Sequence, residues 1–335
     1  MKYFLSHISF CIFIIFSNLT FGKEFNKLFE INIQMEPTKI PFESQVDFAF
    51  EALLVKLLGE ESEEIVFEIL STNRSEDFLL SYAYSKINEL SFLNAKFNQD
   101  FVIQSLRSLD IEFVSQNRPV VLFDVIIDNG FSSPYVLTNS KSEKSINQSI
   151  QNILKQVSEE RGIFLELPVD TLRPIQDEKL QFEKVKNFYS EYDYDFLETI
   201  LIERQDLNEW VLSDKEVNLS FKNIDLLLEY FQNNLQANIY NYLSAFKVSN
   251  DSYQIEIVFS NISDKNTFES LIDFLNKNLV VKEFSIKKFV TNTLTIEIES
   301  YGQVDQLLSS LLFHQNIDDI YFDRESNVIF SRLGT

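Results

Sequence analysis

Large apolar residues dominate one short stretch near the middle of the chain. Arg118-Pro119 leads into Val120–Ile127, in which every residue except Asp124 is large and apolar, and Asp128-Asn129-Gly130 follows as a turn signal. A run of this length is too short for a typical helix and too apolar for a strand on the surface. The pattern therefore predicts a strand that is covered on both faces.

The two faces of this predicted strand differ in polarity, because successive side chains of a strand point to opposite sides. One face is wholly apolar and carries Val121, Phe123, Val125 and Ile127. The other face carries Leu122, Asp124, Ile126 and Asp128. Since two carboxylates interrupt the second face, we expect it to reach solvent or a partner near its end.

The sequence before this strand, residues 27–113, predicts a small α+β unit. Polar and apolar residues alternate from Phe29 to Met35, which is typical of a half-buried strand. Two helical patterns follow, then two strand patterns, then a helix capped by Asn98. The boundaries are a helix ending before Gly59, a helix over Ser62–Leu70, strands over Phe78–Ile87 and Leu90–Phe97, and a last helix reaching Leu109. The order is β-α-α-β-β-α.

Residues 114–248 predict a central α/β sheet domain, because strands alternate with helices after Val120–Ile127. Such alternation indicates βαβ units with parallel pairing. The predicted elements are a helix over Ser145–Arg161, a strand over Ile163–Pro168, a helix over Glu178–Ser190, a strand over Phe196–Ile202, antiparallel additions at Trp210–Leu212 and Val217–Phe221, and a helix over Ile224–Leu243.

Residues 252–331 predict a C-terminal ferredoxin-like domain with the order βαββαβ. Two strands form a hairpin around Thr291-Asn292, and Ile317–Phe322 is the last predicted strand. Two helices cover only one face of such a sheet. We expect the uncovered face to carry Thr293, Thr295, Glu297 and Glu299, together with Lys287 from the preceding strand. This polar, mixed-charge face suits reversible docking.

Residues 1–22 predict a signal peptide and are left out of the fold. Ile8–Phe16 is an apolar segment, and Thr20-Phe21-Gly22 places small residues where a signal peptidase recognises its substrate. An uncleaved inner-membrane anchor is the alternative. No small residue stands directly before Cys11, so a lipoprotein anchor is not expected. The predicted location is the periplasm, with no direct membrane insertion after cleavage.

Composition excludes several classes of function. Removal of Lys2 with the signal peptide leaves 28 Lys and Arg against 51 Asp and Glu, a formal charge of −23. This charge repels phosphate backbones, so nucleic-acid binding is not expected. The remaining chain has no cysteine and a single histidine, His314, which excludes disulfides, thiolate nucleophiles and multi-histidine metal sites. No two of the six glycines lie close together, so a phosphate-binding loop is not expected either.

Carboxylates remain as candidates for acid–base chemistry. A Ser-His-Asp triad would need His314, which we expect to be a partly exposed histidine at a helix C-terminus. Asp124 and Asp170 are the candidate catalytic residues, because the C-terminal ends of parallel strands meet at one edge of a sheet. Further acids expected at this edge are Asp128, Glu166, Asp193 and Asp195. Chance clustering of the many acidic residues is the alternative. Calcium would suit such a cluster, but no Asp-x-Asp-x-Asp-Gly loop is present, and no metal or cofactor is predicted.

Three blocks of the sequence resemble one family. They are Asn117-Arg118-Pro119, the Gly162–Leu172 segment, and Tyr192–Ile202. The chain is similar here to the uncharacterised proteobacterial envelope family called domain of unknown function 2066. The chain departs from the family at Phe113–Gln116, where a Trp-Gly pair is usual, and at Glu203-Arg204, where a glycine is usual. The resemblance implies export in a Gram-negative bacterium and a multi-span inner-membrane permease as a partner. It provides no catalytic residues.

Two hypotheses for the function follow. The first is a non-enzymatic envelope adaptor or scaffold that binds envelope proteins through the C-terminal domain. The second is a carboxylate-dependent hydrolase of envelope glycans that uses Asp124 and Asp170, and it requires two carboxyl groups within about 10 Å of each other across an open cleft.

Overall fold

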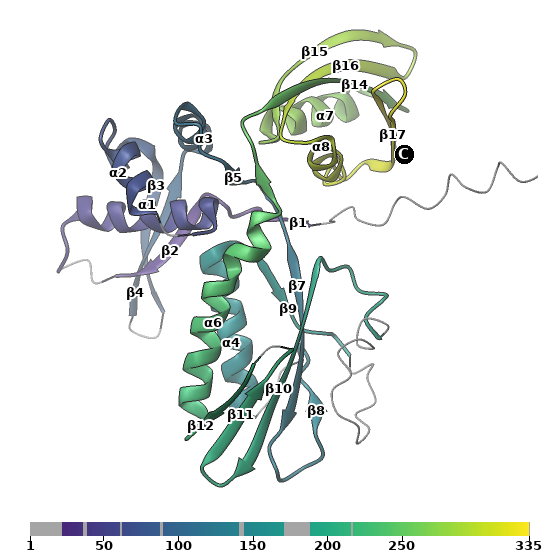
Figure 1. Cartoon of the computed structure of the whole chain (residues 1–335). Coiled ribbons are helices and arrows are strands. Elements are labelled where there is room, and N and C mark those ends of the chain that lie inside the picture. The colour runs from purple at the N-terminus through teal and green to yellow at the C-terminus, as the bar shows by residue number, and fades with distance from the viewer. Residues whose placement is uncertain are drawn as a thin grey trace, which may run out of the picture.

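The computed structural model describes residues 22–35, 39–60, 62–87, 90–140, 144–170, 188–215 and 217–334. Buried apolar side chains form three main cores, which define an N-terminal, a central and a C-terminal unit. Figure 1 shows the three units meeting near the short strands β1 and β5. The predicted multi-domain mixture of α+β and α/β architecture is confirmed. Among the described residues, no helix is both long and apolar enough to cross a membrane.

The N-terminal unit has the predicted β-α-α-β-β-α order. Its elements are β2 (Glu30–Gln34), α1 (Phe42–Leu58), α2 (Glu63–Leu70), a 3-10 turn (Ser75–Phe78), β3 (Leu79–Ile87), β4 (Leu90–Phe97) and α3 (Gln99–Ser108). The strands form an antiparallel sheet in the order β2-β4-β3. The apolar stripe of α1 packs on this sheet, and Gly59 ends the helix with a positive φ of 82°, which glycine adopts without strain.

The central unit is built on the strand predicted from Val120–Ile127, which is β7 (Val120–Asp128). Parallel neighbours lie on both sides of it, as the βαβ pattern predicts. The sheet contains β12 (Asn218–Phe221), β11 (Glu209–Ser213), β10 (Phe196–Asp206), β7 and β8 (Tyr135–Val136) in that order, with β9 (Phe164–Glu166) also paired to β7. The predicted helix over Glu178–Ser190 lies outside the described residues as far as 187.

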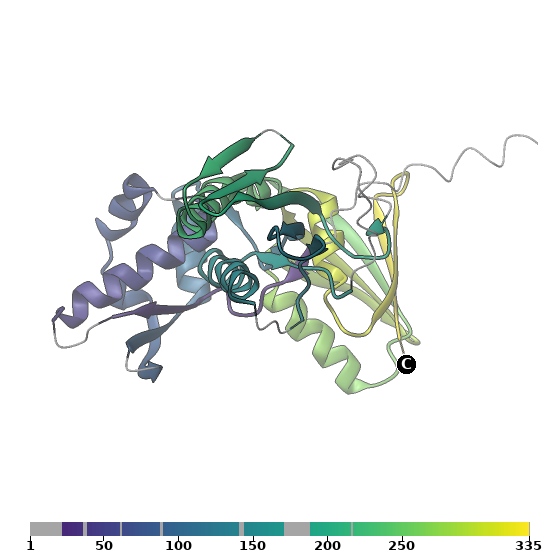
Figure 2. The ribbon, with the colours of Figure 1, turned by 90° about the horizontal axis from the view of Figure 1, so that it is seen from below.

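Two helices cover one face of this sheet. They are α4 (Ser145–Arg161) and α6 (Ile224–Ser244), and Figure 2 shows them side by side and nearly end-on. Phe123 of β7 is buried beneath α6, with its ring edge-on to Phe231 at 6.5 Å between centroids. The apolar face of β7 therefore forms the centre of the second core.

The C-terminal unit contains a strand that the sequence pattern did not predict. The predicted elements are present as β14 (Ser252–Ser260), α7 (Lys265–Lys277), β15 (Val281–Val290), β16 (Thr293–Tyr301), α8 (Val304–Leu311) and β17 (Ile317–Asp323). A further strand, β18 (Val328–Leu333), pairs in parallel with β14 and in antiparallel fashion with β17. The five-stranded sheet has the order β15-β16-β14-β18-β17, so β17 lies at the edge and not beside β14.

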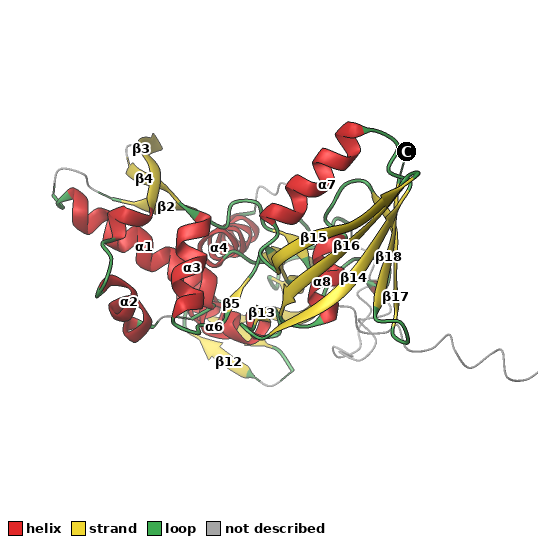
Figure 3. Ribbon diagram, turned by 90° about the horizontal axis from the view of Figure 1, so that it is seen from above, coloured by secondary structure: helices red, strands yellow, loops and turns green. Residues whose placement is uncertain are grey.

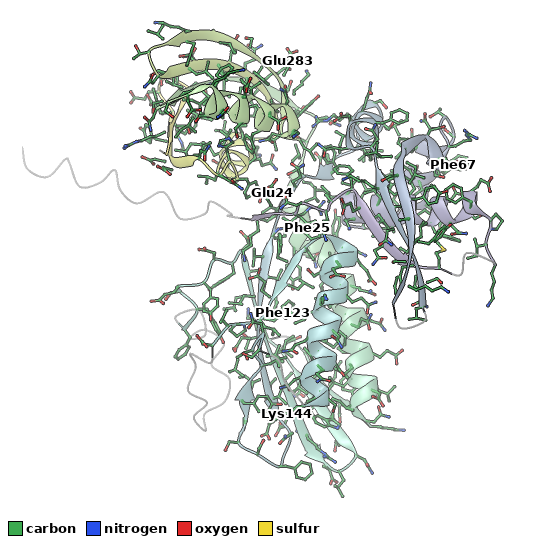
Figure 4. The ribbon with its side chains drawn as sticks, turned by 180° about the vertical axis from the view of Figure 1, so that it is seen from behind. Glu24, Phe25, Phe67, Phe123, Lys144 and Glu283 are labelled. Atoms are coloured by element: carbon green, nitrogen blue, oxygen red, sulfur yellow. The ribbon has the colours of Figure 1, made fainter. Side chains whose placement is uncertain are left out.

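Two-residue strands join the units where they meet. β1 (Lys23–Glu24) pairs with β6 (Asn117–Arg118), and β5 (Phe113–Val114) pairs with β13 (Lys247–Val248). Figure 4 shows Glu24 and Phe25 at this meeting point. The chain passes from the N-terminal to the central unit through β5, and from the central to the C-terminal unit through β13. Both connecting segments are therefore hydrogen-bonded as strands. In the segment that leads from the central to the C-terminal unit, Val248 is buried and packs in the third core.

Two buried cations lie at the same meeting point. Arg118 is fully buried, and its guanidinium donates to three backbone carbonyls, those of Lys56 (2.8 Å), Val114 (2.8 Å) and Ser115 (2.7 Å). Burial lowers the pKa of Arg118 to about 9. Lys56 is buried beside it and donates to the Glu30 carbonyl at 3.1 Å, and burial followed by repulsion from Arg118 lowers its pKa to about 8. Arg118 therefore links α1 to residues 114–115, where the chain passes from the N-terminal to the central unit.

Candidate functional site

The two carboxylates predicted as catalytic candidates lie in opposite environments. Asp124 is 0% exposed, and its Oδ1 accepts a hydrogen bond of 2.8 Å from the Tyr189 hydroxyl. Asp170 is exposed, and its backbone N–H is 3.5 Å from the Tyr192 hydroxyl, which also accepts from the Val169 N–H at 3.2 Å. A glycosidase needs both carboxyl groups open to the same substrate cleft. The sealed position of Asp124 does not provide this arrangement.

The second face of β7 is covered along most of the strand. Tyr189 packs on Leu122 in a small cluster with Phe188, Tyr192, Tyr194 and Leu197. This face is buried as far as Ile126. Asp128, at the end of the strand, is partly exposed, so the face reaches solvent near its end, as expected. Three of the residues that cover this face are tyrosines. Because tyrosines are usually assigned to the surface from sequence patterns, the cover was not predicted.

Two of the other acids expected at this edge, Asp195 and Glu166, have structural partners. Asp195 Oδ2 accepts from the Val120 N–H at 2.8 Å and thereby fixes the start of β7. Glu166 forms an ion pair of 2.7 Å with Lys23 across the meeting point of β9 and β1. Asp193 is exposed to solvent. In the described part of the chain, no three His, Cys, Asp or Glu side chains form a group suited to a metal ion.

His314 is buried, so the prediction of partial exposure is wrong. Its Nδ1 accepts from the Asn316 N–H at 3.3 Å, its Nε2 lies 3.3 Å from Ser270 Oγ, and its ring stands edge-on to Phe274 at 5.1 Å. Burial lowers the pKa of His314 below its ordinary value. These contacts describe a neutral imidazole that packs α7 against the loop after α8, and they place no serine–carboxylate relay around it.

We expect His314 to make the protein less stable in mild acid. Because the folded state holds the pKa of His314 below its value in the unfolded chain, the unfolded chain takes up the proton first, and stability falls as pH drops from 7 through about 6. His314→Gln removes this titration and keeps hydrogen-bonding groups. Its free energy of unfolding is expected to change less than that of the wild type between these pH values. Equal pH slopes for the two proteins would contradict the structural role.

Two grooves lie between the units. The larger, about 1590 Å³, is lined by α1, α2, the N-terminal sheet and the end of α4. Phe48 and Phe67 are exposed in it beside Glu51 and Glu63, and partial burial, then repulsion from Asp47 and Glu63, raises the pKa of Glu51. The smaller groove, about 570 Å³, lies between α3 and α7 and is lined mostly by amide and acidic side chains. The smaller groove brings Ser270 to 3.3 Å from His314, but among the described residues no carboxylate pairs with this imidazole.

A third surface matches the expected open face of the C-terminal sheet. Figure 3 shows α7 and α8 beside the sheet strands, and Figure 1 shows both helices beneath the sheet, between it and the other units. Apolar residues such as Ile255, Ile257, Ile296 and Ile298 face these helices and are buried. Thr293, Thr295, Glu297 and Glu299 alternate with the buried residues of β16 and are partly exposed on the opposite side. We call that side the open face.

Cross-strand ion pairs run over one half of the open face. Lys287 reaches Glu297 at 2.8 Å and Glu256 at 3.6 Å, and Lys282 reaches Glu299 at 2.6 Å. The hydrogen bond from Lys282 is the main reason that the pKa of Glu299 is lowered, and the bond to Glu297 raises the pKa of Lys287. Both effects keep these groups charged near neutral pH.

Apolar side chains occupy the other half of the open face. Tyr321 of β17 and Phe330 of β18 are directly paired neighbours, with 56% and 43% of their surface exposed. Val258 of β14 lies in register with Phe330. The apolar half of the open face was not predicted from the sequence, because β18 was not expected. The open face thus combines an exposed aromatic pair on β17 and β18 with a row of paired charges on the other half.

Comparison with known proteins adds no identification. No protein-family model and no curated protein matches this chain in sequence. Among solved structures, a match is prolyl-tRNA synthetase from Cryptosporidium parvum in complex with L-proline and AMP, with a TM-score of 0.17 and 10% identity over 64% of this chain and 48% of that chain. The match spans about half of that protein, and a TM-score this low supports no argument on fold or function. The resemblance to the envelope family described above stays a prediction.

Proposed function

We propose that this protein is a non-enzymatic adaptor of the cell envelope, which docks a partner protein on the open face of its C-terminal sheet. The observation that carries the proposal is the composition of this face: Tyr321 and Phe330 are exposed beside the ion pairs of Lys282 and Lys287. Aromatic residues surrounded by polar and charged groups are typical of reversible protein–protein contacts. The predicted signal peptide supports a location outside the cytoplasm.

The other two units support this proposal because they hold the C-terminal unit in a fixed orientation. The helices α7 and α8 lie on the side of the C-terminal sheet that faces the other units, so the open face points away from them (Figure 1). Arg107 of α3 donates to the Leu279 carbonyl at 2.7 Å, and its guanidinium lies over the Tyr301 ring at 3.1 Å. These contacts hold the C-terminal unit against the N-terminal unit, so the open face has a fixed direction. The hydrolase hypothesis has no comparable support, because Asp124 is sealed by Tyr189.

Charge reversal on the open face tests the proposal. Lys287→Glu combined with Tyr321→Asp leaves Glu256 and Glu297 without their cation and places a charge in the aromatic pair. The control is Lys155→Glu combined with Phe131→Asp, which reverses one lysine and replaces one exposed aromatic residue by aspartate in the central unit.

The immobilised wild-type protein is exposed to envelope extract at low salt, and the proteins released by high salt are identified by mass spectrometry. We expect a protein that the wild type and the control retain and that the open-face variant loses, by at least about tenfold. If the open-face variant and the control retain the same proteins in the same amounts, the open face is not the docking surface.

A further inference from the structure

The edge strand β3 of the N-terminal unit has a sequence that reads almost the same in both directions. From Leu79 to Ile87 it is Leu-Leu-Ser-Tyr-Ala-Tyr-Ser-Lys-Ile. Around Ala83, the flanking pairs are two tyrosines, two serines, a leucine with a lysine, and a leucine with an isoleucine. When two identical strands pair in antiparallel fashion about a two-fold axis at Ala83, these are the residues that lie opposite each other.

This strand is exposed from Leu80 to Tyr84 and again at Lys86. It lies at the edge of the sheet β2-β4-β3, and no other described strand pairs with its outer side. Leu80, Tyr82 and Tyr84 are 60%, 52% and 44% exposed, although all three are apolar or aromatic. Figure 3 shows β3 at the end of the molecule that lies away from the C-terminal sheet, where a second molecule has access to it.

The tyrosines of β3 are already held in the orientation that pairing requires. Tyr82 and Tyr84 lie in register with the buried residues Ala95 and Leu93, so both point to the face covered by α1. The Tyr82 ring contacts the Phe42 ring at 4.7 Å, and the Tyr84 hydroxyl donates to Gln45 Oε1 at 2.8 Å. Cross-strand aromatic pairs are among the more stabilising pairs in antiparallel sheets, and ordering these side chains beforehand lowers the cost of association.

β15, the longest edge strand of the described sheets, is protected against such pairing. β15 carries Lys282, Lys287 and Lys288, and irregular pairing interrupts it between Val281 and Glu283 and again between Ile286 and Lys288. Lysines and bulges are the usual devices that prevent edge-to-edge association. β3 has one irregularity, between Leu79 and Ser81, and pairs regularly from Ser81 to Ile87.

Charge also favours β3 over other surfaces for self-association. The chain has a formal charge of −22, so two copies repel each other over most of their surface. β3 contains no carboxylate, and its single charge, Lys86, falls opposite Leu80 in the symmetric register. From these observations we infer that a second copy of this chain pairs with β3, Tyr82 against Tyr84, to form a symmetric dimer with a continuous six-stranded sheet.

Charge pairs placed in β3 test this register. In the symmetric dimer, position 82 of one copy lies opposite position 84 of the other. Tyr82→Glu with Tyr84→Glu therefore brings like charges together, whereas Tyr82→Glu with Tyr84→Lys brings opposite charges together. By sedimentation equilibrium at micromolar concentration, we expect the wild type and the Glu–Lys variant to be dimers and the Glu–Glu variant to be a monomer. Circular dichroism checks that all three are folded.

Cysteine cross-linking locates the axis independently. In a chain with Cys11→Ser, Ala83→Cys is expected to form a covalent dimer under mild oxidation. Ser81→Cys and Ser85→Cys are expected to react with each other when mixed, but not each with itself. Ser71→Cys, exposed at the end of α2, is the control and should stay monomeric. A monomeric wild type, a dimer that the Glu–Glu variant does not weaken, or equal cross-linking from Ser71→Cys would each overturn the inference.

Discussion

Replacing Arg118 by methionine is expected to lower the free energy of unfolding by about 3 kcal/mol. The guanidinium donates to the carbonyls of Lys56, Val114 and Ser115 in a fully buried position, and methionine removes all three of these hydrogen bonds. Each unsatisfied buried carbonyl costs about 1–3 kcal/mol, and removal of a buried charge offsets part of this cost. Chemical denaturation monitored by circular dichroism measures the change.

Lys56→Met is the matched control, because it removes the neighbouring buried cation. Lys56 Nζ donates to a single carbonyl, that of Glu30, and its pKa is lowered to about 8. We therefore expect Lys56→Met to equal or exceed the wild type in stability at pH 7. Any gain should be complete below pH 8 and should disappear as pH rises towards 10.5, where the lysine of the unfolded chain loses its proton as well. Similar losses for both variants would show that Arg118 has no special role.

Phe123→Asp is expected to have the largest effect, a loss of about 5 kcal/mol or failure of the central unit to fold. Phe123 lies in the middle of β7, under α6, where Figure 4 shows it inside the central unit. Aspartate at this position introduces a charge with no cation to pair with it and removes the contact with Phe231. Thermal unfolding followed by tryptophan fluorescence reports on this unit, since Trp210 lies on β11 of the same sheet.

The same substitution at an exposed phenylalanine provides the comparison. Phe131 follows β7 and is 77% exposed, so Phe131→Asp is expected to change the stability by no more than about 0.5 kcal/mol. Phe123→Leu, which keeps the position apolar, should retain the native fold. A native-like melting temperature for Phe123→Asp would mean that β7 is not the centre of this core.

Elements with strong periodicity and a clear stop signal were predicted well. The bounds of α4, Ser145–Arg161, are those expected from the apolar stripe and from Gly162, which has a positive φ of 62°. The hairpin of β15 and β16 turns at Thr291-Asn292 as expected, with Thr291 at a φ of 56°. In both places, local residues alone determine where the element ends.

Elements that depend on distant partners were not predicted. The pairs β1–β6 and β5–β13 contain two residues in each strand, which is too short for any periodic pattern. β18 alternates buried Ile329 and Leu333 with exposed residues, but Ser331 is buried at the inward position between them and disrupts the apolar alternation. This strand can be recognised only from its pairing with β14 in the structure.

The candidate site was misjudged for a similar reason. Sequence patterns treat Asp124, Arg118 and His314 as polar and therefore accessible, whereas each is buried through a partner far away in the chain. Tyr189 lies 65 positions from Asp124, and Lys56 lies 62 positions from Arg118. The polar half of the open face, in contrast, was predictable, because alternation along β16 assigns its residues to the two sides of the sheet.

Photo-cross-linking from the open face tests the adaptor role most directly. A photoreactive phenylalanine analogue is incorporated at Tyr321 in the cells that produce the protein, and at the more exposed Phe131 as the control. We expect a covalent adduct of defined mass from Tyr321, lost when Lys287→Glu is added, and no such adduct from Phe131. Identical adducts from both positions, or an adduct from Phe131 alone, would contradict docking on the open face.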